Sequence, residues 1–462
     1  MAETLLIDAV PGEVRAAVMA DGRATEIVVE RAARLSRVGQ IFLGRVQKIM
    51  PALGAAFVEL GLQRAGFLRL DGDAPVTEGQ AVTVQVTKDA AGRKGVQLTR
   101  ELAVAGRTVV LTPTQARLQV SRRIADEAER ARLSQAMAAI AGPGEGFILR
   151  TNAAGATPEE LGADADFVRA IWDEVEMAGH GARAPAVLHA GVDAVPRLLC
   201  EFAGRETERI VVEDPGALAA AKRFCANHAP SLAAIVAAHD GPGALFEEWG
   251  VEAEIEQALS ARVRLPSGGE IVIETTEALT AIDVNSAGSN DSALQLNVEA
   301  AQEIARQLRL RALGGLVVID FVSMSDEERW PRLLSALGTA LAPDRMTPRL
   351  LGRTAAGLVE VTRRRGREPL ARLLAGTEGA ADGAEPARTV ESLAFEALRA
   401  IRREARASPS GRVRVSAEPV LAAELEGPAR PHLDALARAL GRNVAIEPVA
   451  AWPRGRFEIV AE

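Results

Sequence analysis

The chain has 462 residues, of which 48% are apolar and 25% are charged. These fractions are typical of folded proteins and exclude global disorder and a fibrous repeat, while the length predicts several domains rather than one. No apolar run approaches the roughly 18 residues that a membrane span needs. Acidic Glu3, Asp8 and Glu13 stand where a signal peptide has basic and apolar residues. We therefore expect a cytoplasmic protein with no membrane span.

The charged residues are unevenly distributed along the chain. The formal net charge of −8 argues against a nucleic-acid partner, yet segment 38–100 holds 8 basic and 5 acidic residues, and segment 301–374 holds 13 and 8. Only four of the 54 basic residues are lysines, so 50 are arginines, whose planar fork suits phosphate. A GC-rich genome would give the same bias, and the sequence leaves both explanations open.

The first 35 residues predict a β-meander, with strands at 5–7, 14–19 and 24–29 and a turn at Asp21-Gly22. Three short strands do not close a core by themselves, so their partners must come from later in the chain, after an insertion. Segments 217–228 and 231–239 are predicted to be helices of the part that returns to this sheet.

Segment 38–103 has the pattern of a small β-barrel of OB type. Strands are predicted at 41–46, 55–60 and 65–70, followed by strict alternation at 82–87. Aromatic residues are scarce in this chain, so Phe57 and Phe67 are candidates for stacking on RNA bases. Both could equally fill the core of the barrel.

A short apolar strand at 146–150 ends at Arg150-Thr151. A guanidinium followed by a hydroxyl, at the entrance to a turn, could hold a terminal phosphate. A solvated turn is the alternative.

The sharpest signal is a strand–helix–strand unit. Strands are predicted at 271–275 and 279–284, a helix at 298–313 and a continuous apolar strand at 316–321. A right-handed crossover makes the strands on either side of the helix parallel, so Asp283 and Asp320 would end at the same edge of the sheet.

Adjacent strands lie roughly 4.8 Å apart, within reach of one shared cation. Asn285 lies two residues beyond Asp283 and so points to the same side. Two carboxylates with an amide fit Mg²⁺, and Mn²⁺ would also fit. The alternative is that one Asp caps a helix or pairs with an arginine.

Several long motifs resemble the ribonuclease E/G family, bacterial endoribonucleases that cut single-stranded RNA. The match is longest in TEALTAIDVNS (276–286) and in NVEAAQEIARQLRLRALGGLVVIDFVSM (297–324). It extends to GRVQKIMPALGAAFVELG (44–61), SRRI (121–124), GFILRT (146–151) and EALRAIRREA (396–405), and so covers most of the chain.

The resemblance implies an α/β and α+β multidomain fold in which an RNase-H-like subdomain is split by an OB-fold domain and a 5′-sensor. The implied parts are RNase-H-like 1–37 and 193–258, OB-fold 38–103, 5′-sensor 104–192, a DNase-I-like catalytic subdomain at 259–373, a linker at 374–389 and a small C-terminal α+β domain at 390–462.

The resemblance also assigns roles to single residues. It implies that Asp283 and Asp320 bind Mg²⁺ and that Asn285 is the accompanying catalytic residue. It implies that Phe57, Phe67 and Lys94 bind RNA. It also implies that Arg150 and Thr151 read a 5′-monophosphate.

Several departures from the family matter. Segment 376–389 has no cysteine where the family has a C-P-x-C zinc link, which argues against zinc and leaves the family's homo-oligomer open. Leu118-Gln119 replaces the paired glycines near the sensor. The Arg- and Pro-rich tail of the longer family members is absent, so we expect the short, ribonuclease-G-like form without a degradosome scaffold.

Cys200 and Cys225 are expected to be buried thiols.

We therefore predict a Mg²⁺-dependent endoribonuclease that cleaves single-stranded RNA in RNA processing and decay. The alternatives are an RNA-binding protein of the same architecture without turnover, and a nuclease for duplex RNA or DNA that uses the same carboxylates. Arg363-Arg364-Arg365 forms either a solvated face or a contact with RNA backbone.

Overall fold

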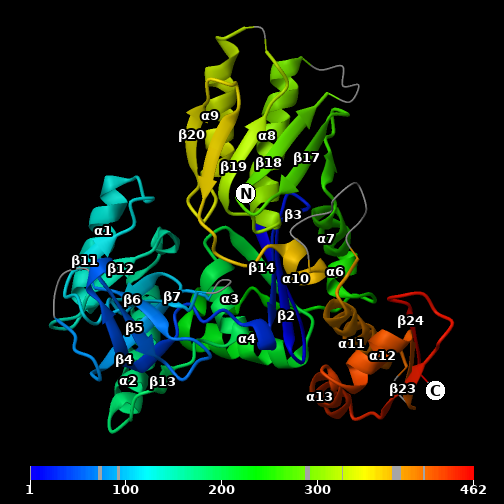
Figure 1. Ribbon diagram of the computed structural model, residues 1–462, viewed down its shortest axis with the longest axis horizontal. Coiled ribbons are helices and arrows are strands. Elements are labelled where there is room, and N and C mark those ends of the chain that lie inside the picture. The colour runs from blue at the N-terminus through cyan, green and yellow to red at the C-terminus, as the bar shows by residue number, and fades with distance from the viewer. Residues whose placement is uncertain are drawn as a thin grey trace. The chain divides into compact units, whose positions relative to one another are not determined.

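The computed structural model describes residues 2–461, except 71–74, 91–93, 287–291, 325, 377–386 and 409–410. The predicted linker falls largely on the undescribed 377–386. The chain forms two compact units (Figure 1). The first contains Met1–Ala33, Val211–Asp214 and Ala238–Glu462, and the second contains Arg34–Ile210 and Pro215–Ala237. Each unit is a mixture of helices and sheets.

The predicted N-terminal meander is present, and later strands complete its sheet. Strands β1 (Glu3–Val10), β2 (Glu13–Ala20) and β3 (Arg23–Arg31) pair antiparallel. The sheet order is β15-β14-β1-β2-β3, with β14 (Thr207–Val212) and β15 (Val236–Ala238) ending in the first unit. The short helices α6 (Leu245–Glu248), α7 (Val251–Leu259) and α10 (Leu370–Ala375) share a buried apolar core with this sheet.

The helix predicted at 231–239 is wrong in its second half. Helix α5 (Pro230–Ala233) ends early, and β15 follows it. The amide of Ile210 donates to the carbonyl of Ile235 at 2.9 Å, and the amide of His239 donates to the carbonyl of Val212 at 2.9 Å. Pairing with β14 therefore overrides the helical propensity of an alanine-rich segment.

A six-stranded sheet of the first unit contains the predicted strand–helix–strand unit. Its order is β16-β17-β18-β19-β21-β20. Helices α8 (Ala293–Leu310) and α9 (Arg329–Leu341) share one apolar core with this sheet (Figure 1). The strands are β16 (Arg262–Arg264), β17 (Glu270–Thr275), β18 (Leu279–Asn285), β19 (Gly315–Asp320), β20 (Arg349–Arg353) and β21 (Val359–Arg363).

The C-terminal part has an apolar core that also includes Val10 of β1, and a three-stranded sheet of order β23-β22-β24. Its elements are α11 (Val390–Ala407), β22 (Val413–Ala417), α12 (Pro419–Glu426), α13 (Arg430–Leu440), β23 (Val444–Pro448) and β24 (Phe457–Ala461). Thr389 caps α11, because its hydroxyl accepts the amide of Ser392 at 3.1 Å.

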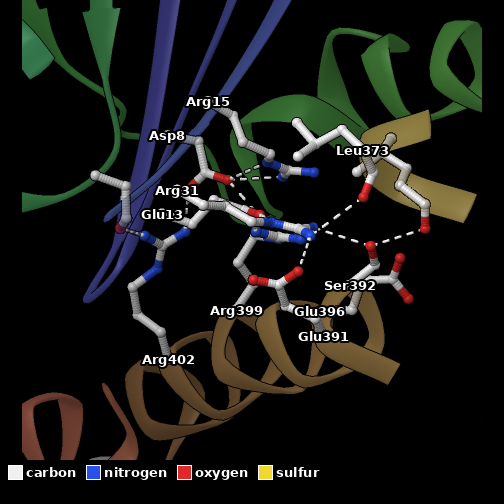
Figure 2. Close-up of polar contacts among 12 residues, drawn as sticks. Asp8, Glu13, Arg15, Arg31, Leu373, Glu391, Ser392, Glu396, Arg399 and Arg402 are labelled. Carbon is white, nitrogen blue, oxygen red and sulfur yellow. Dashed lines mark hydrogen bonds and ion pairs between the residues drawn. The ribbon is translucent and has the colours of Figure 1, made fainter. Parts of the chain in front are cut away.

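Arginines of α11 reach carboxylates at the start of the chain (Figure 2). Asp8 is 2% exposed and accepts hydrogen bonds from Arg15 Nη2 at 2.6 Å and from Arg402 Nη2 at 2.7 Å. Glu13 is equally buried and pairs with Arg31 Nε at 2.7 Å and with Arg399. The sequence pattern does not predict the burial of these two carboxylates.

Arg31 is the centre of this buried cluster. It is 1% exposed, and it donates to the Ser392 hydroxyl at 2.9 Å and to the Leu373 carbonyl at 3.2 Å (Figure 2). Burial raises the pKa of the Asp8 carboxyl, but the charges of Arg15, Arg402 and Arg399 outweigh it and hold that pKa below its usual range. The cluster therefore fixes α11 against β1–β3 through charges that remain ionised.

The second unit contains a closed five-stranded barrel of OB-like form. The strands are β4 (Ile41–Met50), β5 (Ala55–Glu59), β6 (Gly66–Arg69), β8 (Gln97–Thr99) and β7 (Ala81–Lys88), and β4 pairs with β7 to close the barrel. An additional strand, β13 (Ala186–His189), pairs with β4. The barrel predicted from the sequence is therefore confirmed.

The rest of the second unit is a four-stranded sheet with helices. The sheet order is β11-β12-β10-β9, and α1 and α2 contribute to its core. The elements are β9 (Val104–Ala105), β10 (Val109–Leu111), β11 (Leu118–Val120), α1 (Glu127–Ile140), β12 (Phe147–Leu149), α2 (Pro158–Gly179), α3 (Ala194–Phe202) and α4 (Pro215–His228).

Cys200 and Cys225 are free and buried, as predicted, and burial raises the pKa of their thiols to about 12 and about 11. Across the described ranges, no helix is both long enough and apolar enough to span a membrane.

Candidate active site

Two aspartates lie side by side at the carboxyl edge of the six-stranded sheet. Strands β18 and β19 are adjacent and parallel, and Asp283 is the register partner of Asp320. Both side chains are exposed. Asn285 Nδ2 donates to Asp283 Oδ2 at 2.7 Å, so the amide and this carboxylate face one another. The strand pattern predicts this juxtaposition.

Alternation along the strands explains why these polar side chains share one face. Ile282, Val284 and Ile319 are 2%, 4% and 0% exposed and belong to the core with α8 and α9. Their neighbours Asp283 and Asp320 therefore point to the opposite, open face. The helices cover one side of the sheet and leave the acidic side accessible to a substrate.

The acid pair has no cationic partner in the part of the chain that the structure describes. Glu270, on the neighbouring strand β17, is paired with Arg262, but no ion pair forms to Asp283 or Asp320 among the described residues. Neither Asp caps a described helix. The two alternatives to a metal site, a helix cap and an arginine pair, are therefore not found there. Two uncompensated carboxylates fit a hard divalent cation that keeps several waters.

The two candidate aromatic residues lie together on the barrel. Phe57 and Phe67 are register partners on β5 and β6, with ring centroids 6.0 Å apart in an edge-to-face arrangement. Both are half-buried and lie outside the core cluster, which is filled by their neighbours Ala56, Val58 and Leu68. The alternative that both rings fill the barrel core is wrong.

The barrel also carries exposed lysines, one of which is paired in register with an aromatic residue. Lys94 is exposed and precedes β8, whose Gln97 is the register partner of Phe67. Lys48 is exposed on β4 and is the register partner of Phe57. Sequence reasoning missed Lys48, although its scarcity as one of four lysines could have drawn attention to it.

Arg150 and Thr151 lie at the end of β12, close to the SRRI motif. The hydroxyls of Thr151 and Ser121 are 3.1 Å apart. The Arg150 guanidinium donates to the Gly106 carbonyl, and the Arg150 amide donates to the Thr108 carbonyl at 2.7 Å. The structure therefore brings together two motifs that are about 30 residues apart in the chain.

A buried carboxylate organises the loop that receives Arg150. Asp164 on α2 is 0% exposed and accepts hydrogen bonds from the amides of Arg107, Thr108 and Val109 at 2.9, 2.6 and 2.9 Å. Sequence reasoning did not single out Asp164. Its sequence signal is an acidic residue at the same spacing as the apolar residues that form the buried face of α2.

Arg363 of the arginine triplet is not solvated. It is 7% exposed, pairs with Asp344 at 2.7 Å and donates to the Leu313 carbonyl at 2.6 Å. The interpretation of the triplet as a solvated or RNA-binding face is therefore wrong for Arg363, because its charge is neutralised inside the fold.

Comparison with known proteins identifies the family. A model described as the Ribonuclease E/G family matches residues 103–366, more than half of the chain. The chain is similar to ribonuclease G of Escherichia coli (strain K12), with 34% identity over 100% of both proteins. It is similar to ribonuclease G of Haemophilus influenzae, with 33% identity over 99% of both, and to ribonuclease E of the same organism, with 35% identity over 87% of this chain and 46% of that protein. The chain therefore belongs to the ribonuclease E/G family and is an endoribonuclease of that type.

Proposed function

We propose that this endoribonuclease is Mg²⁺-dependent, cleaves single-stranded RNA, and uses Asp283 and Asp320 as its metal ligands. The observation that carries the proposal is the pairing of these two carboxylates, in register, on the open face of the sheet. Carboxylate oxygens are the ligands that Mg²⁺ prefers, and Mn²⁺ fits the same donors. No thiolate contributes to this donor set, which argues against zinc.

Mg²⁺ bound here would supply hydroxide near neutral pH and would offset charge on a phosphorane-like transition state. The carboxylates of Asp283 and Asp320 hold the site together and balance its charge. Besides the Nδ2 hydrogen that is donated to Asp283, the Asn285 amide offers Oδ1, which can accept a hydrogen bond from the attacking water, and a second N–H, which can donate to the scissile phosphate. The products carry 5′-phosphate and 3′-hydroxyl ends.

The barrel binds the single strand. Phe57 and Phe67 stack on bases, which stabilises a complex by about 1–3 kcal/mol per base and requires unpaired RNA. Lys48 contributes positive charge beside Phe57, and Lys94 contributes positive charge from the segment that precedes β8. Arg150 and Thr151 bind a 5′-monophosphate, with the Ser121 hydroxyl as a neighbour of Thr151.

The domain assignment belongs to the same proposal. The sheet of β1–β3 with β14 and β15 is the split RNase-H-like subdomain, and the six-stranded sheet is the DNase-I-like catalytic subdomain. The inserted parts are the OB-fold and the 5′-sensor, and α11–β24 is the small domain.

The decisive experiment compares cleavage of a single-stranded oligonucleotide by the wild type, Asp283→Asn and Asp320→Asn. Each variant is expected to lose at least 100-fold in rate with Mg²⁺ present, because one of two charged ligands is gone. Glu274→Gln, which removes an exposed carboxylate on β17, is the matched control and should cleave at the wild-type rate.

EDTA should abolish RNA cleavage by the wild type, and an excess of Mg²⁺ should restore cleavage. Wild-type rates from either aspartate variant would defeat the metal assignment. A wild-type protein that binds the oligonucleotide but never cuts it would instead support an RNA-binding protein without turnover.

A further inference from the structure

An asparagine buried in α8 uses both of its amide atoms on a single residue. Asn297 is 0% exposed. Its Nδ2 donates to the carbonyl of Val322 at 2.8 Å, and its Oδ1 accepts the amide of Val322 at 3.0 Å. These paired bonds fix the position and the orientation of one peptide segment relative to the helix.

Val322 lies two residues beyond Asp320, just after the end of β19. The last register pair of β19 with β18 is Asp320 with Asp283, and the last with β21 is Ile319 with Val359. Sheet pairing of β19 therefore ends at Asp320, and the Asn297 side chain holds the backbone two residues beyond it. Asp320 therefore lies between the paired part of β19 and the Asn297–Val322 hydrogen bonds.

The first turns of α8 hold the opposite loop as well. Glu299 Oε1 accepts the amide of Ser267, in the turn between β16 and β17, at 3.2 Å. Parallel strands joined by a helix place the start of the helix near the carboxyl edge of the sheet. Asn297 and Glu299 therefore anchor loops at the edge that carries the acid pair.

Burial of Asn297 has no evident benefit for stability. Its neighbours on the helix, Leu296, Ala300 and Ala301, are at most 1% exposed and belong to the apolar core. Asparagine is a poor helix former, and a buried amide gains little over an apolar side chain of the same shape. A buried polar group at such a place is explained by a geometric requirement, because metal ligands must be held within about 0.5 Å of their working positions.

We propose that Asn297 is a positioning residue that sets Asp320 relative to Asp283 and thereby determines the affinity for the divalent cation. The inference rests on the proposed function, since it assumes that these two carboxylates bind the metal. Asn297 itself contacts neither RNA nor metal, and it acts through the backbone of Val322.

The test measures Mn²⁺ binding to the full-length protein by electron paramagnetic resonance, without RNA. Asn297→Leu keeps the shape and removes both hydrogen bonds, and it is expected to weaken Mn²⁺ binding at least tenfold. Exchange of the Val322 amide with solvent should accelerate, as seen by mass spectrometry. In cleavage assays the Mg²⁺ requirement should rise while the KM for RNA stays within twofold.

Gln307→Met is the matched control. Gln307 is also 0% exposed and also uses both amide atoms, on Glu303 at 2.8 Å and on Arg311 at 2.6 Å, but it lies at the other end of α8. Its substitution perturbs the helix core to a similar extent and should leave Mn²⁺ affinity within twofold. An equal loss of affinity in both variants would overturn the proposal, because it would indicate a general effect on the fold.

A second variant separates position from charge. Asn297→Asp keeps an acceptor for the Val322 amide but loses the donor to the Val322 carbonyl. A positioning role predicts weaker Mn²⁺ binding, whereas simple attraction by the added negative charge predicts tighter binding. This variant also keeps the proposal testable if Asn297→Leu does not fold.

Wild-type Mn²⁺ affinity in the Asn297 variants, with affinity lost in Asp320→Asn, would refute the positioning role alone. Wild-type affinity in Asp283→Asn and Asp320→Asn would instead refute the proposed metal site.

Discussion

Asp8 of the first strand and Arg402 of the helix α11 form a buried ion pair, with 2.7 Å between Asp8 Oδ1 and Arg402 Nη2 (Figure 2). The side chains are 2% and 5% exposed. The pair joins residues near the two ends of the chain. It therefore links α11, the first helix of the C-terminal part, to the N-terminal sheet.

Removal of one charge from this pair should be costly. Arg15 also pairs with Glu252, and Arg402 also pairs with Glu213, so Asp8→Asn removes one of two carboxylates from each buried guanidinium. The free energy of unfolding should therefore fall by about 3 kcal/mol, the lower end of the cost of breaking a buried pair. Urea unfolding measures this change. Asp434→Asn removes a carboxylate from an exposed pair with Arg430 and should cost no more than about 0.5 kcal/mol. Equal losses in the two variants would contradict the account.

The same cluster predicts how stability depends on pH. Burial raises the pKa of Asp8 and Glu13, but neighbouring arginines lower both values below those of an unfolded chain. The unfolded state then takes up protons first as the pH falls. The contribution of each carboxyl to the free energy of unfolding should therefore be retained above pH about 4. Below that pH, the free energy should fall by up to about 1.4 kcal/mol per pH unit for each carboxyl.

Urea unfolding between pH 2.5 and pH 7 checks this dependence. The Asp8→Asn protein should show a shallower decline below pH 4 than the wild type, since one of the two carboxyls is absent. If the free energy of unfolding falls equally steeply below pH 4 in both proteins, the cluster does not determine the loss of stability in acid.

The aromatic pair should act on RNA binding and not on chemistry. Phe57→Ala and Phe67→Ala each remove one stacking surface of about 1–3 kcal/mol, so the KM for a single-stranded substrate should rise roughly tenfold. The value of kcat should change less than threefold. Leu53→Ala removes a 61% exposed apolar side chain from the same barrel and serves as the control. An unchanged KM in both phenylalanine variants would remove the rings from the binding site.

The Arg150–Thr151 pair should distinguish the 5′ ends of substrates. The wild type should cleave a 5′-monophosphorylated RNA faster than its 5′-hydroxyl counterpart, because Arg150 and Thr151 supply a cation and a hydroxyl donor. Arg150→Ala should reduce the difference at least tenfold, with the rate on 5′-hydroxyl RNA unchanged. Equal wild-type rates on both substrates would refute the sensor assignment.

Elements with a strong local pattern could be predicted from the sequence. The meander of β1–β3, the barrel and the β18–α8–β19 unit all follow from period-two or helical patterns, with turns marked by glycine. The alignment of Asp283 with Asp320 follows from two strands that end in the same way. These features depend on residues close together in the chain.

Features that depend on distant partners could not be predicted. The burial of Arg31, Arg363 and Arg402 requires carboxylates or carbonyls from segments far away, and a pattern count treats arginine as a surface residue. The strand at Val236–Ala238 exists because β14 pairs with it. The placement of Lys48 beside Phe57 depends on a register shift between Val46 and Lys48.

The divided sheet of the first unit affects the order of events during synthesis. Strands β1–β3 leave the ribosome about 175 residues before β14, which corresponds to roughly 10–35 s at typical elongation rates. The arginines of α11, which pair with Asp8 and Glu13, are synthesised later still. During this delay the apolar strands β1–β3 lack β14 and β15, which complete their sheet. The inserted second unit has time to fold in the same interval. The β1–β3 segment is therefore exposed to aggregation during this interval and is a site where chaperone binding would protect the chain.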